Sequence, residues 1–261
     1  MDCYILSHNG LGDNILMNGA LNYFSKYYNN VFFLCKDTNI HHIKYLYENT
    51  NIIPISFDSK NEYNECNKIL KAKYKNCDVF ISGCHKSYLK TQKTISQIEN
   101  DQRTIFIPSH FHFGSNFYKD IGLNPSIMIS HFNLNISTEI ANMYNDISKY
   151  KLIFLHTESS QSTINLSDIV TSFILKNEYL LICADKNFYE VNDTKFKLAN
   201  KYVKLPTIIH YAEIIKNAEE LHMVDSSISC LSLCLKLSGK TICEKIKIYN
   251  RFTSQPIDLS V

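Results

Sequence analysis

Short apolar segments rich in β-branched and aromatic residues alternate with longer amphipathic stretches, and this alternation constrains the fold more than any other feature. The first series of apolar segments comprises residues 3–7, 31–34, 52–56 and 78–82. The alternation starts again at residue 151, with segments 151–156, 179–184, 201–205 and 220–224. Strands that alternate with helices form parallel sheets with helices on their faces. The two series therefore predict two parallel-sheet domains of the α/β class.

The alternation lapses over residues 108–125, where turn-forming residues gather between the two series. We place the boundary near residue 133, so that Rossmann-like domains comprise residues 1–132 and 133–261. Ser137, followed by Glu139, would begin the helix that leads into the second series. We expect the two domains to be of similar size and to face each other across a cleft.

Composition argues against several classes of protein. The 27 Lys and Arg residues against 25 Asp and Glu give a formal net charge of +2 without a basic run, so no nucleic-acid partner is expected. The longest apolar runs fall far short of the roughly 20 residues of a transmembrane helix. The first ten residues lack the pattern of a secretory signal, so a cytoplasmic location is expected. Nine cysteines without a CxxC pair favour buried thiols over disulfides or a zinc site.

The segment HNGLGDNIL, residues 8–16, joins the first predicted strand to the first predicted helix. Gly10 and Gly12 would let the backbone turn tightly and a ligand approach, and Asp13 lies at the helix N-terminus. This loop is the expected ligand site of an open parallel sheet. Ile15 stands where a dinucleotide fingerprint needs its third glycine, which argues against a nicotinamide or flavin oxidoreductase. The alternative is a plain turn with Asp13 as a helix cap.

Asp225, Ser226 and Ser227 stand between an apolar strand and a strongly apolar helix, within residues 223–237. Hydroxyl groups and free backbone N–H groups at a helix N-terminus form an anion site that suits a diphosphate. The alternative is simple N-capping by Asp225 or Ser226.

The segment HTESSQST, residues 156–163, follows the first strand of the second domain and therefore lies on the same rim as Asp225. Its hydroxyl groups and Glu158 could hold a ribose, a phosphate and a sugar, and the alternative is a solvent loop. The residues that we expect to bind are Thr157, Glu158, Ser159 and Ser160.

A pair of histidines, His110 and His112, lies among aromatic residues in PSHFHFGSNFY, residues 108–118. Such a pair could bind a metal ion, but the sequence offers no third ligand, so no metal site is expected. Aromatic stacking on a sugar ring or packing between the domains is the favoured interpretation.

In order and spacing, these segments resemble the ADP-heptose:lipopolysaccharide heptosyltransferase-like group of GT-B enzymes, glycosyltransferase family 9. GLGDNILMNGAL (10–21) resembles the GD-x-I/L motif of the group, and VDSSISCLSLCL (224–235) resembles its D-S-x-x-x-H-L-A motif. With the two-domain pattern, the resemblance covers most of the chain. The opening segment is also similar to that of glycosyltransferase-like proteins of viruses and marine microbes.

The resemblance implies a GT-B glycosyltransferase that moves a sugar from a nucleotide-sugar donor to a hydroxyl group of a glycan or glycoconjugate. It implies inverting transfer without a metal or other cofactor. Asp13 would be the catalytic base, while Ser226 and Ser227 would contact the donor diphosphate. His8, at the end of the first strand, is the alternative base. Gly10 and Gly12 are counted among the donor-binding residues with the polar segments of the second domain.

Two residues depart from the pattern of the group. Cys230 stands where the pattern has His, and Ile164 stands where a phosphate-binding Lys often follows the polar loop. The loss of two cationic partners keeps a second hypothesis open. In that hypothesis the chain is a degenerate GT-B module that binds nucleotide or glycan without catalysis.

Overall fold

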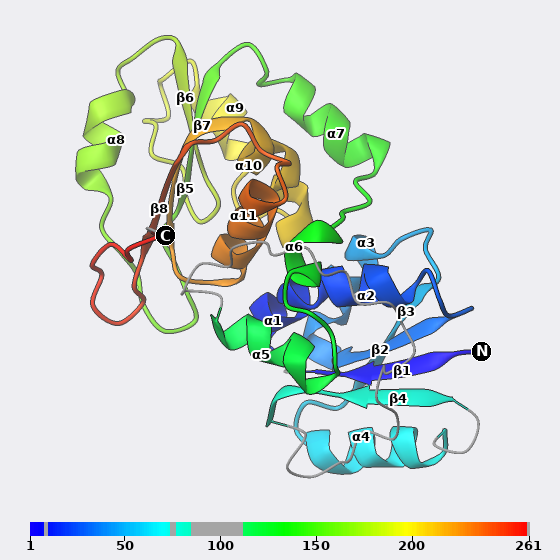
Figure 1. The fold of residues 1–261 in the computed structure, drawn as a ribbon. Coiled ribbons are helices and arrows are strands. Elements are labelled where there is room, and N and C mark those ends of the chain that lie inside the picture. The colour runs from blue at the N-terminus through cyan, green and yellow to red at the C-terminus, as the bar shows by residue number, and fades with distance from the viewer. Residues whose placement is uncertain (8–9, 74–76, 85–111, 260–261) are drawn as a thin grey trace. The chain divides into compact units, whose positions relative to one another are not determined.

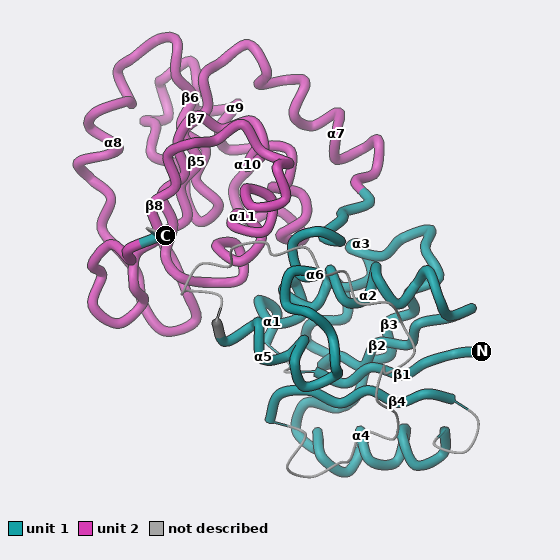
Figure 2. The backbone as a smooth tube through the Cα atoms, viewed as in Figure 1, with its two compact units in different colours: residues 1–135, 259–261 teal, residues 136–258 magenta. Residues whose placement is uncertain are grey.

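The chain folds into two compact units, Met1–Asn135 with Leu259–Val261 and Ile136–Asp258 (Figures 1 and 2). The computed structural model describes residues 1–7, 10–73, 77–84 and 112–259. In the described residues, each unit contains one four-stranded parallel sheet with helices on its faces. The predicted α/β fold with two parallel-sheet domains is confirmed. The division falls between Asn135 and Ile136, against an expected boundary between residues 132 and 133.

The first sheet has the strand order β3-β2-β1-β4. Its strands are β1 (Cys3–Leu6), β2 (Val31–Lys36), β3 (Ile52–Phe57) and β4 (Asp78–Ile81). The described helices of this unit are α1 (Leu11–Leu16), α2 (Asn18–Phe24), α3 (Ile40–Leu46), α4 (Glu62–Lys71), α5 (His112–Asp120) and α6 (Ile127–Ser130), with a 3-10 turn η1 (Asp37–Asn39).

The two faces of the first sheet are covered by different helices because successive strand residues point to opposite sides. On one face, Cys66 and Leu70 of α4 pack against Tyr4, Leu6 and neighbouring strand residues. On the other face, Phe24 of α2 stacks on a ring of β4, with 4.6 Å between the ring centroids. β1 and β4 are therefore buried on both faces, as their continuous apolar sequences predict, whereas β3 at one edge of the sheet is partly exposed.

Tyr118 of α5 fixes the break between α1 and α2. Its hydroxyl donates to Leu16 O at 2.6 Å and accepts from Ala20 N at 3.1 Å. These are the two groups that would bond to each other in a continuous helix. The phenol thus enters the helical hydrogen-bond ladder, which is a recognised cause of a helix break. The side chain of Tyr118 is fully buried, so α5 determines where α1 ends.

The second sheet has the strand order β6-β5-β7-β8. Its strands are β5 (Lys151–His156), β6 (Tyr179–Cys183), β7 (Ala218–Val224) and β8 (Lys245–Tyr249). The helices are α7 (Thr138–Asn145), α8 (Ser167–Phe173), α9 (Phe196–Asn200), α10 (Ala212–Asn217) and α11 (Ser227–Leu237), with a 3-10 turn η4 (Ile208–Tyr211). Ser137 caps α7 as predicted, because its hydroxyl accepts from Ile140 N at 3.3 Å.

The predicted strand at residues 201–205 is wrong, and the fourth strand of the second sheet is β8. The segment forms turns instead, because its polar backbone groups bond to other partners. Lys204 has a positive φ of 52° and its N–H donates to Ala184 O. Leu205 N donates to the hydroxyl of Tyr211 at 2.9 Å. In β8, the sequence KIKIY alternates lysine with isoleucine, as an edge strand does.

None of the described helices is long and apolar enough to span a membrane.

Candidate functional site

The strand order of each sheet changes direction at one place, and the predicted segments follow the strands that flank it. In the first sheet β4 lies on the opposite side of β1 from β2, and in the second β7 lies on the opposite side of β5 from β6. Ligands of open parallel sheets bind at the carboxyl ends of strands beside such a point. Asp13 follows β1, while Thr157 and Asp225 follow β5 and β7.

Asp13 is the third residue of α1, and its carboxylate folds back on the start of the helix. Its Oδ2 atom accepts a hydrogen bond from Gly10 N at 3.1 Å. A Cβ atom at position 10 would lie 2.5 Å from that oxygen, so any larger residue there would force the Asp13 carboxylate to shift. Gly10 itself has an ordinary extended backbone, with φ −68° and ψ 151°. Gly12 lies within the first turn of α1, and His8 lies outside the described residues.

Polar groups also gather where β1 and β4 end. Ser82 Oγ donates to Ser7 Oγ at 3.0 Å, and both residues are fully buried. Gly83, with a positive φ of 68°, donates its N–H to Asp120 Oδ2 at 2.9 Å. Asp120 of α5 therefore fixes the turn after β4 beside the place where the strand order changes.

The polar segment after β5 forms a tight hairpin. Glu158 and Thr163 make an antiparallel bridge, and Ile164 N donates to Thr157 O at 2.9 Å. Ser159 Oγ accepts from the N–H groups of residues 161 and 162, so this hydroxyl shapes the turn. The side chain of Ile164 is buried, which gives a packing reason for an apolar residue at this position.

The four residues predicted to bind a donor in this hairpin differ in exposure. Thr157 is 1% exposed, and its hydroxyl bonds to a carboxylate of the same unit. Glu158 and Ser160 are exposed, and Ser159 is half-buried. Of these four residues, only Glu158 and Ser160 are therefore exposed to solvent.

Asp185, which follows β6, holds the base of this hairpin and was not identified from the sequence. Its Oδ2 accepts from Thr157 N, from Glu158 N at 3.2 Å and from Thr157 Oγ1 at 3.2 Å. Its Oδ1 accepts from His156 Nδ1 at 3.0 Å. Burial alone would raise the pKa of Asp185, but the hydrogen bond and field of His156, with the backbone N–H donors, hold that pKa below its usual value. Asp185 is thus an ionised anchor for the segment.

The residues after β7 form the N-terminus of α11. Ser226 is the N-cap, and its hydroxyl accepts from Ile228 N at 3.2 Å. Ser226 N donates in turn to Ser229 Oγ at 2.9 Å, which completes a capping box. Ser227 is the first residue of the helix and is half-buried. The cap uses an acceptor position of the Ser226 hydroxyl and leaves its O–H available to donate.

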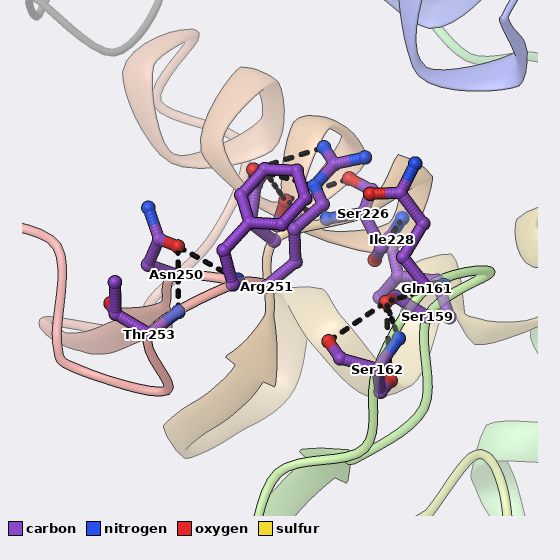
Figure 3. Close-up of polar contacts among 11 residues, drawn as sticks. Ser159, Gln161, Ser162, Ser226, Ile228, Asn250, Arg251 and Thr253 are labelled. Atoms are coloured by element: carbon purple, nitrogen blue, oxygen red, sulfur yellow. Dashed lines mark hydrogen bonds and ion pairs between the residues drawn. The ribbon is translucent and has the colours of Figure 1, made fainter.

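The structure brings a cation to this helix from a distant part of the sequence. Arg251, in the turn after β8, donates from Nε and Nη2 to Asp225 Oδ2 at 3.2 and 2.9 Å. Figure 3 draws Arg251 together with Ser226 and with Gln161 of the β5 hairpin. The neighbouring carboxyl ends of β5, β7 and β8 thus contribute one polar edge.

Metal-binding residues form no cluster in the part of the chain that the structure describes: no three His, Cys, Asp or Glu side chains are placed to share an ion. His110 lies outside the described residues, and His112 is the first residue of α5. Cys230, on α11, is half-buried.

Comparison with solved structures identifies proteins of similar architecture. A glycosyl transferase of family 9 from Veillonella parvula superimposes with a TM-score of 0.55 and 13% identity, over 89% of this chain and 77% of the other. The chain shares its fold with a family 9 glycosyltransferase. The Escherichia coli ADP-heptose lps heptosyltransferase II gives a TM-score of 0.55 and 9% identity, over 95% and 90% of the two chains.

A third structure, the Escherichia coli heptosyltransferase WaaC with ADP, gives a TM-score of 0.51 and 12% identity, over 96% and 86% of the two chains. The resemblance drawn from the motifs therefore holds at the level of the fold. Neither a known family model nor a curated protein matches the sequence.

Proposed function

We propose that the chain is a glycosyltransferase that moves a sugar from a nucleotide-sugar donor to an acceptor hydroxyl of a glycan or glycoconjugate. The observation that carries the proposal is the fold shared with a family 9 glycosyltransferase and heptosyltransferases over 89–96% of this chain. The polar residues after β1, β5 and β7 support it, because they lie where open parallel sheets bind ligands.

The donor diphosphate binds in this proposal at the N-terminus of α11. The positive end of the helix dipole faces the phosphates, and the O–H groups of Ser226 and Ser227 donate hydrogen bonds to phosphate oxygens. The β5 hairpin, with Glu158 and Ser160 exposed, contacts the ribose or the sugar. The same groups stabilise the nucleoside diphosphate as it leaves, so this mechanism does not require a metal ion.

Asp13 acts as the general base in the first unit. The acceptor oxygen attacks the anomeric carbon, its proton passes to the Asp13 carboxylate, and the bond from that carbon to the phosphate oxygen breaks. The diphosphate leaves with the electron pair, and attack opposite the leaving group inverts the configuration. A positioned carboxylate typically accelerates such a step by about 10²–10⁴-fold. Its present hydrogen bond to Gly10 N occupies one oxygen and orients the carboxylate.

The test is Asp13→Asn, because an amide oxygen can still accept the hydrogen bond from Gly10 but the side chain cannot take up the proton. Nucleoside diphosphates and nucleotide sugars are first screened by thermal shift and then by donor hydrolysis and transfer. We expect Asp13→Asn to lower turnover at least ~10²-fold while nucleotide affinity and melting temperature stay near those of the wild type.

A matched control is Asp37→Asn in the same unit. Asp37 also accepts from backbone N–H groups, from Thr38 N at 2.8 Å and Ser59 N at 3.3 Å, but belongs to the turn after β2. Turnover should be unaffected in this variant. Full turnover in Asp13→Asn would remove Asp13 from the mechanism. Nucleotide binding by a wild-type protein that neither hydrolyses nor transfers any donor would instead support the degenerate binding module.

A further inference from the structure

The two sequence segments of the second unit that are proposed to bind the donor supply no cationic side chain to the diphosphate. Residues 156–163 contain no Lys or Arg, and residues 223–237 contain only Lys236. Lys236 lies in the last turn of α11, where its Nζ donates to Glu244 O at 2.9 Å. Asp225 adds a negative charge at the opposite end of the helix. The Asp225 carboxylate would repel a diphosphate bound at this helix N-terminus and offset the positive end of the helix dipole, unless a cation neutralises the carboxylate.

Arg251 is placed to supply that charge. Its Nε and Nη2 atoms both donate to one oxygen of Asp225, so the carboxylate occupies one edge of the guanidinium. The second hydrogen of Nη2 and one hydrogen of Nη1 form another edge, and no described residue accepts from Nη1. This second edge is a two-pronged donor that matches two oxygens of a phosphate. The side chain is 33% exposed, so a ligand can reach it.

The turn that carries Arg251 is held at both ends. Asn250 Oδ1 accepts from Phe252 N at 2.8 Å and from Thr253 N at 3.1 Å, as Figure 3 shows for Thr253. Asn250 N donates to Gln255 O at 2.8 Å, which closes the turn. At the root of the turn, Asp225 N donates to Tyr249 O at 2.8 Å. Arg251 is thus fixed from its backbone and from its Asp225 contact before any ligand arrives.

We propose that Arg251 is the phosphate-binding cation of the donor site, with Asp225 as the residue that positions its guanidinium. The inference rests on the proposed function, because it takes the ligand to be the diphosphate of a nucleotide sugar. It also specifies that site: the cation comes from the turn after β8, rather than from the β5 hairpin or α11.

The test measures dissociation constants of ADP, GDP, UDP and CDP, and of the four parent nucleosides, by calorimetry on the full chain. A charge-assisted hydrogen bond contributes enough that Arg251→Gln should weaken the best nucleoside diphosphate about 10- to 100-fold. Affinity for the parent nucleoside should not change, because it has no phosphate. Arg251→Lys keeps the positive charge but lacks the second donor edge, so its affinity for the nucleoside diphosphate should lie between those of the wild type and Arg251→Gln.

The double variant Asp225→Asn with Arg251→Gln separates direct phosphate contact from mere neutralisation of the carboxylate. If the guanidinium binds phosphate, the double variant regains only the affinity that the uncompensated Asp225 carboxylate costs in Arg251→Gln, and it stays weaker than the wild type. Recovery of wild-type affinity in the double variant would overturn the proposal, since Arg251 would then only cancel Asp225. The matched control is Lys201→Gln, which breaks an exposed ion pair with Asp146 in the same unit, N–O distance 3.0 Å, and should leave affinity unchanged.

Two further outcomes are decisive. Wild-type binding of a nucleoside diphosphate together with equal affinity in Arg251→Gln would overturn the role of Arg251 and leave the proposed function standing. A wild-type protein that binds none of the nucleoside diphosphates would overturn both. Melting temperatures of all variants are measured without ligand, and Arg251→Lys supplies the affinity comparison if Arg251→Gln does not fold.

Discussion

Replacing Asp185 should destabilise the second unit more than its single negative charge suggests. Its side chain is 10% exposed and accepts hydrogen bonds from His156, Thr157 and Glu158. In Asp185→Ala the backbone N–H of Thr157, a residue that is 1% exposed, loses its partner, and so does Nδ1 of His156. A buried unsatisfied donor costs about 1–3 kcal/mol, so we expect Asp185→Ala to lower the free energy of unfolding by about 3–5 kcal/mol.

Asp185→Asn separates the hydrogen-bond geometry from the charge. Its amide oxygen can replace Oδ2 and accept from the two backbone N–H groups, while its NH₂ group faces a His156 ring that can change tautomer. Only the charge assistance is lost, so the expected cost falls to about 1–2 kcal/mol. Because Asp185 has a lowered pKa, its contribution is complete above the unfolded value of about 3.9 and is lost as the pH falls through the folded value.

Urea unfolding followed by far-UV circular dichroism measures these differences, since the chain has no Trp to report by fluorescence. The matched control is Asp146→Ala, which removes an exposed carboxylate, 56% exposed, from its ion pair with Lys201 in the same unit. That variant should cost below about 1 kcal/mol. A loss of unfolding free energy in Asp185→Ala no larger than in Asp146→Ala, or one that stays the same at pH values below the lowered pKa of Asp185, would contradict this role of Asp185.

Two further variants test the packing and the pH response. A Cβ atom on Gly19 would overlap the α6 backbone, so Gly19→Ala should lower the free energy of unfolding by at least ~2 kcal/mol in urea unfolding. The control is Gly239→Ala, which has open space but a φ of +69° and should lower it by about 1 kcal/mol. Equal losses in the two variants would contradict the overlap. Burial lowers the pKa of His222 despite its 3.1 Å contact with Glu220, so the unfolded chain binds the extra proton below about pH 6.5. As the pH falls below 6.5, protonation of His222 should therefore lower the free energy of unfolding by up to about 1.4 kcal/mol per pH unit. If His222→Gln showed the same pH slope as the wild type, the slope would not come from His222.

The sequence predicts a strand most readily where a short apolar run is enough to indicate it without knowledge of the neighbouring strands. β1, β2, β5 and β6 are short buried runs between helical stretches, and periodicity identifies them without knowledge of the partner strand. Residues 201–205 have a similar composition, but the hydroxyl of Tyr211 and the carbonyl of Ala184 compete for their backbone groups. Such long-range competition is not visible in a local pattern.

The candidate site was predictable where it follows a predicted strand. The segments that contain Asp13, Thr157 and Asp225 are of this kind, and Asp185 directly follows a predicted strand, so its position was available from the sequence. Arg251 could not be identified from the sequence pattern, because β8 was not predicted and the residue lies 26 positions from its partner Asp225. The roles of Asp13 and Ser226 as helix caps were weighed from the sequence, and their geometry required the structure.

The chain that follows the Arg251 turn covers part of the edge of the second sheet. After the turn the chain runs back along β8, with a Tyr249–Pro256 bridge and a bond from Ile257 N to Ile248 O at 2.7 Å. β8 is an edge strand, whose open N–H and C=O groups would otherwise invite pairing with a strand of another molecule. The returning chain occupies part of that edge and places a proline on it. The segment that carries Arg251 therefore also hinders pairing of β8 with a strand of another molecule, and we expect a change that loosens this segment to favour aggregation.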